Sequence, residues 1–327
     1  MWSEFAEKPF ENLVNIELRA MATDQVAEAL LGYDAFANPS ARHKIWRYLG
    51  LPRPKGLVLD PSHWGGGTQP TQTQIGAQVS TSLILQYKRC EYMVRSNAGQ
   101  SHLWDGEHYY RFGVADLQQT VLKRLEDNVG ASAAVRYVAP AFHTFRQLVS
   151  HHSSGTGLAH SGFVAPGGLQ GHRYWTYICA GREGIANPYL PLPFETFDEL
   201  RATLTDAAKA TPKATVQAVA QAMIATAVAA AAGELEANRL DLDSAEDEAR
   251  EGILDSPGQP ILRIDVGPAS ELGRPAIERL IRTPEPPDGL DVDLESLVAL
   301  RQATAAASIL GVDWMLCMVQ PPVLQTG

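Results

Sequence analysis

The sequence predicts an α/β (α+β) chain with a mixed sheet in its first part, then a β-containing extension, then an acidic, mainly helical C-terminal region. Three observations lead to this prediction. Residues 83–89 (LILQYKR) alternate as a buried strand does. Residues 113–128 carry apolar side chains at three- and four-residue spacing, which indicates an amphipathic helix. Residues 191–327 hold 22 acidic and 10 basic side chains, whereas residues 1–190 hold 15 and 17.

In the first part, helices and strands follow one another closely. Pro9 is a favourable first helical residue, so a helix is expected over residues 10–20. Gly130 is a suitable residue to end the helix at 113–128, and Pro140 closes a strand at 133–138. The remaining expected elements are a strand or strand-turn at 26–36, a short helix at 41–48 and a short strand at 56–60.

The rest of the chain reads as a strand followed mostly by helices. We place the domain boundaries at residues 1–145, 146–196 and 197–327. The expected elements are a strand at 174–180, helices at 194–210, 214–240 and 244–252, a strand at 261–266, a helix at 294–310 and a strand at 312–319. Residues 216–232 are rich in alanine but shorter than the roughly 20 apolar residues of a membrane span, so a packed helix is expected and no membrane partner.

Composition points to a reducing compartment. The three cysteines are odd in number and far apart, which is typical of free thiols in the cytoplasm. The first residues lack the basic-then-apolar pattern of a signal peptide. All nine histidines lie in residues 1–190, and their spacing matches no usual zinc pattern. We therefore expect a cytoplasmic protein with ordinary loop histidines.

The strand at 83–89 carries two polar side chains on one face. Alternation places Leu83, Leu85 and Tyr87 on one side of the strand. Gln86 and Lys88 then stand side by side on the other. An amide and an ammonium on a buried strand need polar partners, and a cluster of carboxylates around a metal is one natural choice. The alternative is a strand end that emerges into solvent, with Lys88 extending its charged head into water.

Residues 28–34 provide a second pattern, this time with acidic residues, in which Glu28 and Asp34 stand on either side of Gly32. Together with Gln86 and Lys88 the pattern is E-x3-G-x-D … Q-x-K, which resembles the PD-(D/E)xK, or restriction-endonuclease-like, nuclease superfamily in its glutamine variant. The expected order of helix, strands, helix and strand over residues 9–142 agrees with the αβββαβ core of that family.

The resemblance implies a role for each of these side chains. Asp34 and Gln86 would hold Mg²⁺ (or Mn²⁺), and Lys88 would act on the attacking water. Because Gln86 offers only a neutral oxygen, Glu28 would supply the missing charge, with Glu17 in reserve. Family members often carry a polar residue on the second helix that faces the site, and Gln118 is the residue at that place here.

Basic residues between positions 42 and 95 form a patch along the chain near the motif. A phosphate backbone would run beside such a patch, although a solvated loop face has the same composition. The residues expected to bind nucleic acid are Arg42, Lys44, Arg47, Arg53, Lys55 and Arg89.

The resemblance thus implies a metal-dependent endonuclease acting on DNA, in bacterial restriction or antiviral defence, and as a homodimer because many relatives are dimers. Two alternatives remain open. In the first alternative, the chain is a catalytically silent nucleic-acid-binding module of a defence complex. In the second, its acidic C-terminal region binds a protein partner. The second alternative predicts that removing residues 197–327 abolishes complex formation and spares cleavage. Other hydrolase motifs (G-x-S-x-G, H-E-x-x-H) and the dinucleotide-binding G-x-G-x-x-G are absent from the sequence.

Overall fold

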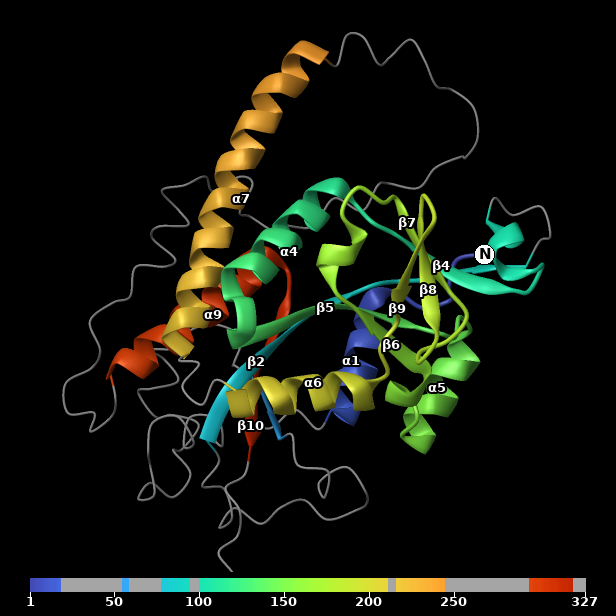
Figure 1. Cartoon of the computed structure of the whole chain (residues 1–327), viewed down its shortest axis with the longest axis horizontal. Helices are drawn as coiled ribbons and strands as arrows, with labels where there is room; N and C mark the ends of the chain where they lie inside the picture. The colour runs from blue at the N-terminus through green and yellow to red at the C-terminus, as the bar shows by residue number, and fades with distance from the viewer. Residues whose placement is uncertain (19–54, 59–77, 95–99, 211–215, 245–293, 320–327) are drawn as a thin grey trace, which may run out of the picture.

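The structure, a computed structural model, describes residues 1–18, 55–58, 78–94, 100–210, 216–244 and 294–319. The described residues form a mixed α/β fold with two sheets (Figure 1). The central sheet has the strand order β1-β10-β2-β5-β6, and the second sheet has the order β3-β4-β7-β8-β9. The strands are β1 Lys55–Val58, β2 Gln78–Tyr87, β3 Glu91–Met93, β4 Tyr109–Gly113, β5 Ala133–Pro140, β6 Ser161–Val164, β7 Tyr174–Tyr177, β8 Glu183–Asn187, β9 Leu190–Pro193 and β10 Asp313–Val319.

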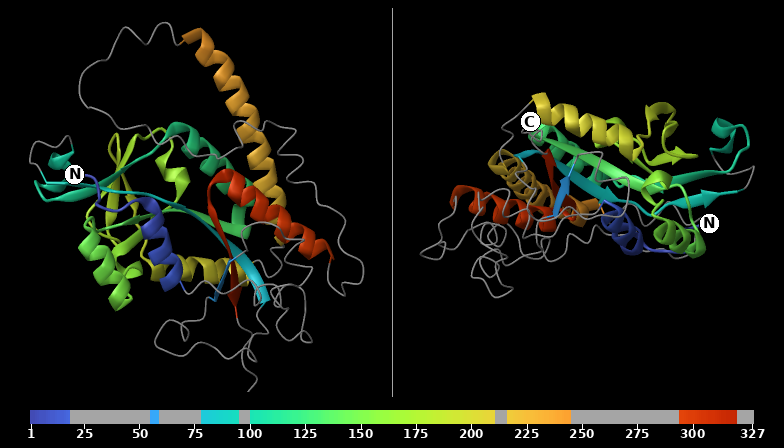
Figure 2. Two further views of the ribbon diagram at one scale, coloured as in Figure 1. Left: turned by 180° about the vertical axis from the view of Figure 1, so that it is seen from behind. Right: turned by 90° about the horizontal axis from the view of Figure 1, so that it is seen from below.

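Helices cover the central sheet and flank the second one. The α-helices are α1 Glu7–Glu17, α4 Asp116–Val129, α5 Phe145–Ser154, α6 Phe197–Ala210, α7 Val216–Ser244 and α9 Leu294–Leu310. Short 3₁₀ turns lie at η3 Ser101–Trp104, η4 Gly130–Ser132, η5 Leu158–His160 and η6 Pro166–Leu169. The longest helix, α7, packs against α9 through its first part, and its other half projects away from α9 (Figures 1 and 2). Across the described ranges, no helix combines the length and the apolar character needed to span a bilayer.

Strand β2 is the middle strand of the central sheet, and it has one parallel and one antiparallel neighbour. β5 pairs with it in parallel and is reached through α4, whereas β10 pairs with it in the antiparallel direction. β10 also pairs in parallel with β1, so it lies between β1 and β2 (Figure 2). The sheet is mixed, as predicted. It takes strands from both sides of residues 145 and 196, so the expected domain boundaries do not coincide with the limits of this sheet.

The two faces of β2 belong to two hydrophobic clusters, which confirms the alternation expected from the sequence. Leu83, Leu85 and Tyr87 pack with residues of α1 and α6. Ile84 lies on the other face, in a cluster with residues of α4, α7 and α9. That second cluster also contains Phe112, Trp175 and Tyr177 of the second sheet, so the core is continuous between the sheets.

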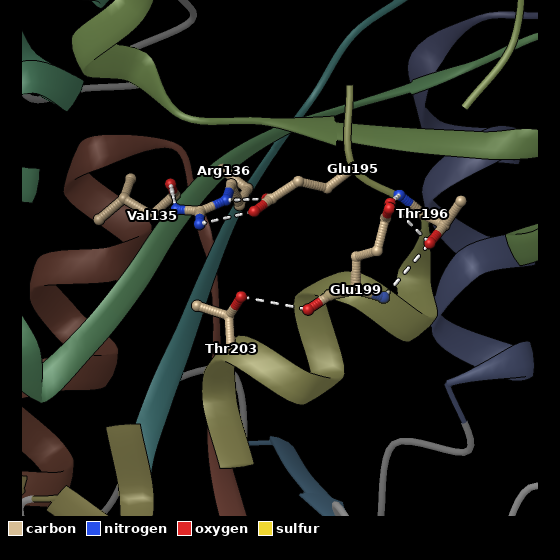
Figure 3. A network of polar contacts seen from close by, with 6 residues as sticks. All are labelled: Val135, Arg136, Glu195, Thr196, Glu199 and Thr203. Carbon is tan, nitrogen blue, oxygen red and sulfur yellow. Dashed lines mark hydrogen bonds and ion pairs between the residues drawn. The ribbon is translucent and has the colours of Figure 1, made fainter. Parts of the chain in front are cut away.

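Two helices, α5 and α6, start at side-chain caps. Thr144 and Gln147 form a capping box at the start of α5, in which each side chain bonds the other residue's backbone N–H. At the start of α6 the Thr196 hydroxyl accepts the Glu199 N–H at 3.2 Å, and the Glu199 carboxylate accepts the Thr196 N–H at 2.7 Å (Figure 3). These reciprocal bonds satisfy backbone donors that a helix leaves free in its first turn.

One ion pair joins β5 to the segment that leads into α6. The Arg136 guanidinium donates to both oxygens of Glu195, at 2.6 and 3.4 Å, and also to the carbonyl of Val135 at 3.0 Å (Figure 3). Both side chains are mostly buried. The two-pronged geometry fixes where the chain leaves the sheet, and α6 therefore starts at a defined position on the face that carries Leu85.

Most expected elements that fall on described residues are present, with shifted ends. The helix expected at 10–20 is α1, those at 113–128 and 294–310 are α4 and α9, and the strands at 133–138 and 312–319 are β5 and β10. Helix α5 and the strands β3, β4, β6, β8 and β9 were not predicted from the sequence. The elements expected at 26–36, 41–48 and 261–266 lie outside the described residues, as does nearly all of the one expected at 244–252.

Candidate active site

Gln86 and Lys88 lie at the end of β2, on the face that packs against α4. Both are buried, with 9% and 8% of their surface exposed. Gln86 stands opposite Tyr137 in the parallel pairing with β5, and the Lys88 backbone N–H donates to the Val138 carbonyl at 2.9 Å. The ladder to β5 thus continues through Lys88, which holds both side chains beneath the helix.

The Lys88 ammonium is held by groups that carry no charge. It donates a short hydrogen bond to the Gln118 side-chain oxygen, and it lies 5.1 Å from the centre of the Tyr137 ring. Within the described ranges no carboxylate forms an ion pair with it. Burial lowers the pKa of Lys88 to about 8, and the more distant charge of Glu7 opposes part of that shift.

The Gln86 amide is only half satisfied. Its nitrogen donates to the Tyr87 carbonyl at 3.3 Å. Its oxygen is buried and accepts no hydrogen bond from the described residues. A buried oxygen without a partner costs about 1–3 kcal/mol, and both polar ends of the Gln100 side chain likewise lack a partner among the described residues. A neutral carbonyl oxygen is a ligand that Mg²⁺ and Mn²⁺ accept, and this oxygen therefore fits the expected metal.

Two glutamines in the first turns of α4 approach the end of β2. Gln118, the residue named from the resemblance, is the hydrogen-bond acceptor of Lys88. Gln119 is buried, and it accepts from the Tyr137 hydroxyl at 2.9 Å while donating to the Pro166 carbonyl at 2.5 Å. Burial raises the pKa of Tyr137, so its hydroxyl stays protonated and remains a donor. Tyr137 was not predicted as a site residue, although alternation along the strand at 133–138 places it on the same face as Val135.

Several expected site residues lie outside the described residues. Glu28 and Asp34 are among them, and so are four residues of the basic patch, Arg42, Lys44, Arg47 and Arg53. Lys55 is the first residue of β1, at the edge of the central sheet, and only its backbone is described. The structure brings together Gln86, Lys88 and Gln118, and the metal and nucleic-acid roles of the others stay predictions.

Arg89, the last expected nucleic-acid contact, holds the N-terminal segment in place. Its guanidinium donates to the Ser3 carbonyl at 2.5 Å and to the Ser3 hydroxyl at 3.2 Å, and it lies 5.5 Å from the Trp2 ring. Its backbone N–H donates to the Glu7 carboxylate at 3.2 Å. Any contact with a phosphate would have to share the guanidinium with these bonds.

Glu17, the reserve metal ligand, is engaged elsewhere. Its two carboxylate oxygens accept the backbone N–H groups of Gly157 and Leu158, each at 2.7 Å. It therefore ties the end of α1 to the turn η5. Both of its oxygens already have donors there, which argues against a place in the cluster of Gln86 and Lys88.

One acidic residue that the structure places beside β2 is Asp313, the first residue of β10. It stands opposite Leu85, and its carboxylate accepts from the Tyr87 hydroxyl at 3.2 Å and from the Asn15 amide at 3.0 Å. This contact lies on the α1 face, whereas Gln86 and Lys88 point to the α4 face. No cluster of three or more His, Cys, Asp or Glu residues able to hold a metal occurs among the described residues.

Comparison of the chain with protein-family models, with curated proteins and with solved structures finds no match.

Proposed function

We propose that the chain is a metal-dependent nuclease that hydrolyses phosphodiester bonds of DNA, in bacterial restriction or defence. One observation carries the proposal. At the end of a central strand, Gln86 has a buried amide oxygen without a partner among the described residues, and Lys88, two positions later, has a buried ammonium without a carboxylate partner among them. A fold pays an energetic penalty for both groups, and a phosphodiester with its cation would satisfy both.

In this proposal Gln86, Asp34 and Glu28 hold Mg²⁺ or Mn²⁺, with the two acids assigned from the family resemblance. The bound cation would lower the pKa of a water and counter the charge on the phosphate. A water oxygen would bond to phosphorus while the P–O bond to the leaving nucleotide breaks, and the leaving oxygen would take a proton from solvent. Lys88 takes the proton of the water as a neutral amine, or it donates to a phosphoryl oxygen as an ammonium.

The test is cleavage of plasmid and of single-stranded DNA by the full chain, with Mg²⁺, with Mn²⁺ and with a chelator. Cleavage is expected only with metal, and Lys88→Ala should abolish it. Lys123→Ala is the matched control, because Lys123 is a partly exposed lysine of α4 that pairs with Asp127 away from the cluster. A Lys88→Ala protein that cuts as fast as the wild type would refute the proposal.

A second candidate is a nucleic-acid-binding module without activity. It is favoured by the neutral Gln86 in the place of a carboxylate and by the lack of an acidic cluster among the described residues. This candidate predicts DNA binding that is independent of metal, with no cleavage under any condition above. Binding measured by fluorescence anisotropy, with and without chelator, separates the two candidates.

A further inference from the structure

We infer that Tyr137 is a positioning residue for Lys88. The face of its ring contacts the ammonium and restricts where it lies, and a hydrogen bond to Gln119 fixes the ring. The inference rests on the proposed function in one respect, because it takes Lys88 as the group that acts on the substrate. The contact between the Tyr137 ring and the Lys88 ammonium can be tested without any activity.

The ring is placed to attract the ammonium. The Lys88 nitrogen lies 5.1 Å from the ring centre, within the distance at which an aromatic face attracts a cation. Tyr137 is fully buried and Lys88 is 8% exposed, so little water screens the attraction. Gln118 provides the only hydrogen bond found for this ammonium in the described chain, and the ring is its second support.

The ring is in turn fixed at its far end. The Tyr137 hydroxyl donates to Gln119 at 2.9 Å, and the Gln119 amide donates to the Pro166 carbonyl at 2.5 Å. Both polar ends of the Gln119 side chain are thus used. Phe112 of β4 packs against the same ring with centres 5.7 Å apart. The ring is therefore held by β5, by α4, by the turn η6 and by the second sheet.

This arrangement defines where the ammonium stands relative to Gln86. Gln86 is the direct neighbour of Tyr137 in the β2–β5 pairing, and Lys88 follows two positions later on the same face. A lysine side chain has many rotamers, and a catalytic group must be held in one. Gln118 and the ring restrict the side chain from two directions. Removing the ring is expected to free it while leaving its charge and its hydrogen bond in place.

The test uses the full chain grown with lysine labelled with ¹³C at Cε. The chain has seven lysines, so the spectrum is simple, and a Lys88→Arg sample assigns the signal of Lys88. A methylene group held over an aromatic ring has its proton signal moved upfield by the ring current. We expect an upfield Lys88 signal in the wild type and in Tyr137→Phe, which keeps the ring, and its return to the usual position in Tyr137→Met.

An unshifted Lys88 signal in the wild type would overturn the inference, and so would an upfield signal that persists in Tyr137→Met. The wild-type measurement decides the matter alone if the methionine variant does not fold. In the nuclease assay, Tyr137→Met should lower kcat by about 2- to 30-fold and leave the KM for DNA unchanged. A wild type without activity but with the upfield signal would refute the proposed function and still support the contact between Tyr137 and Lys88.

Discussion

Lys88 loses its water on folding and gains a neutral amide and an aromatic ring in exchange. Neither partner compensates a buried positive charge as a carboxylate would, and the pKa of about 8, against an ordinary value of 10.5, expresses that loss. Between these two values the unfolded chain binds more protons than the folded chain. Stability therefore rises with pH through this window, and the penalty is complete below pH 8.

Lys88→Met should remove that penalty. At pH 7 the variant is expected to be more stable than the wild type by up to about 3 kcal/mol, because a shift of one pKa unit is worth about 1.4 kcal/mol. The difference should shrink as the pH rises to 10. Urea unfolding of both proteins at pH 7 and pH 10 measures it, since the other titrating groups cancel in the comparison. A difference that does not change with pH would contradict the assignment.

Gln86→Glu should tighten metal binding. The substitution places a carboxylate where the buried amide oxygen has no partner among the described residues, and a further charge strengthens the hold on a hard divalent cation. We expect affinity for Mn²⁺ to increase by about tenfold, or about 1.4 kcal/mol, in isothermal titration calorimetry. Gln86→Leu is the control and should weaken binding. Equal affinities in all three proteins would show that position 86 does not contact the metal.

At the scale of the elements, alternation and helical spacing carried part of the prediction. β2 was expected from the alternation of its side chains and α4 from apolar residues at helical spacing, whereas β5, α9 and β10 were expected without such a period. α5 was missed, since the two exposed apolar residues Phe145 and Val149 disguise its amphipathic pattern. Strands β8 and β9 were missed because glycine and proline, Gly184 and Pro191 among them, weaken the strand signal there.

The capping box of α5 gives a prediction at this scale. Thr144→Ala removes the side chain that accepts the Gln147 N–H, and it should destabilise the protein by about 1 kcal/mol. Ser153→Ala is the control in the same helix, because its hydroxyl only bonds back to the Val149 carbonyl. That change should be neutral or slightly stabilising. Thermal unfolding of both variants checks the difference, and equal melting temperatures would show that the cap contributes nothing.

For the molecule as a whole, sequence reasoning found the strands of the central sheet near the motif but not their order. Nothing local in residues 313–319 indicates that they pair with β2 and β1, because such a pairing depends on contacts far apart in the chain. The same limit applies to the site. Gln86 and Lys88 could be placed on one face from alternation, and Gln118 came from the resemblance. That Tyr137 lies beside Lys88 could not be predicted without knowing how β2 pairs with β5.

Because β10 lies within the central sheet, removing residues 197–327 should affect the fold and not only a partner-binding region. Removing residues 197–327 takes away the strand between β1 and β2, together with Met315 and Cys317 of the core. We expect the truncated chain to lose its fold and with it any cleavage, instead of keeping cleavage and losing only a partner. Circular dichroism and thermal unfolding of residues 1–196 would show this. A cooperative transition in the fragment would mean that the first part folds by itself.

The central place of β10 also has a consequence for synthesis on the ribosome. Tyr87 leaves the exit tunnel long before its hydrogen-bond partner Asp313, which is translated 226 positions later. Until then one edge of β2 lacks its native neighbour and is open to mispairing with other nascent chains. The strand that carries Gln86 and Lys88 can complete its ladder only after β10 has emerged, which delays any activity at that strand until residues 313–319 have been translated.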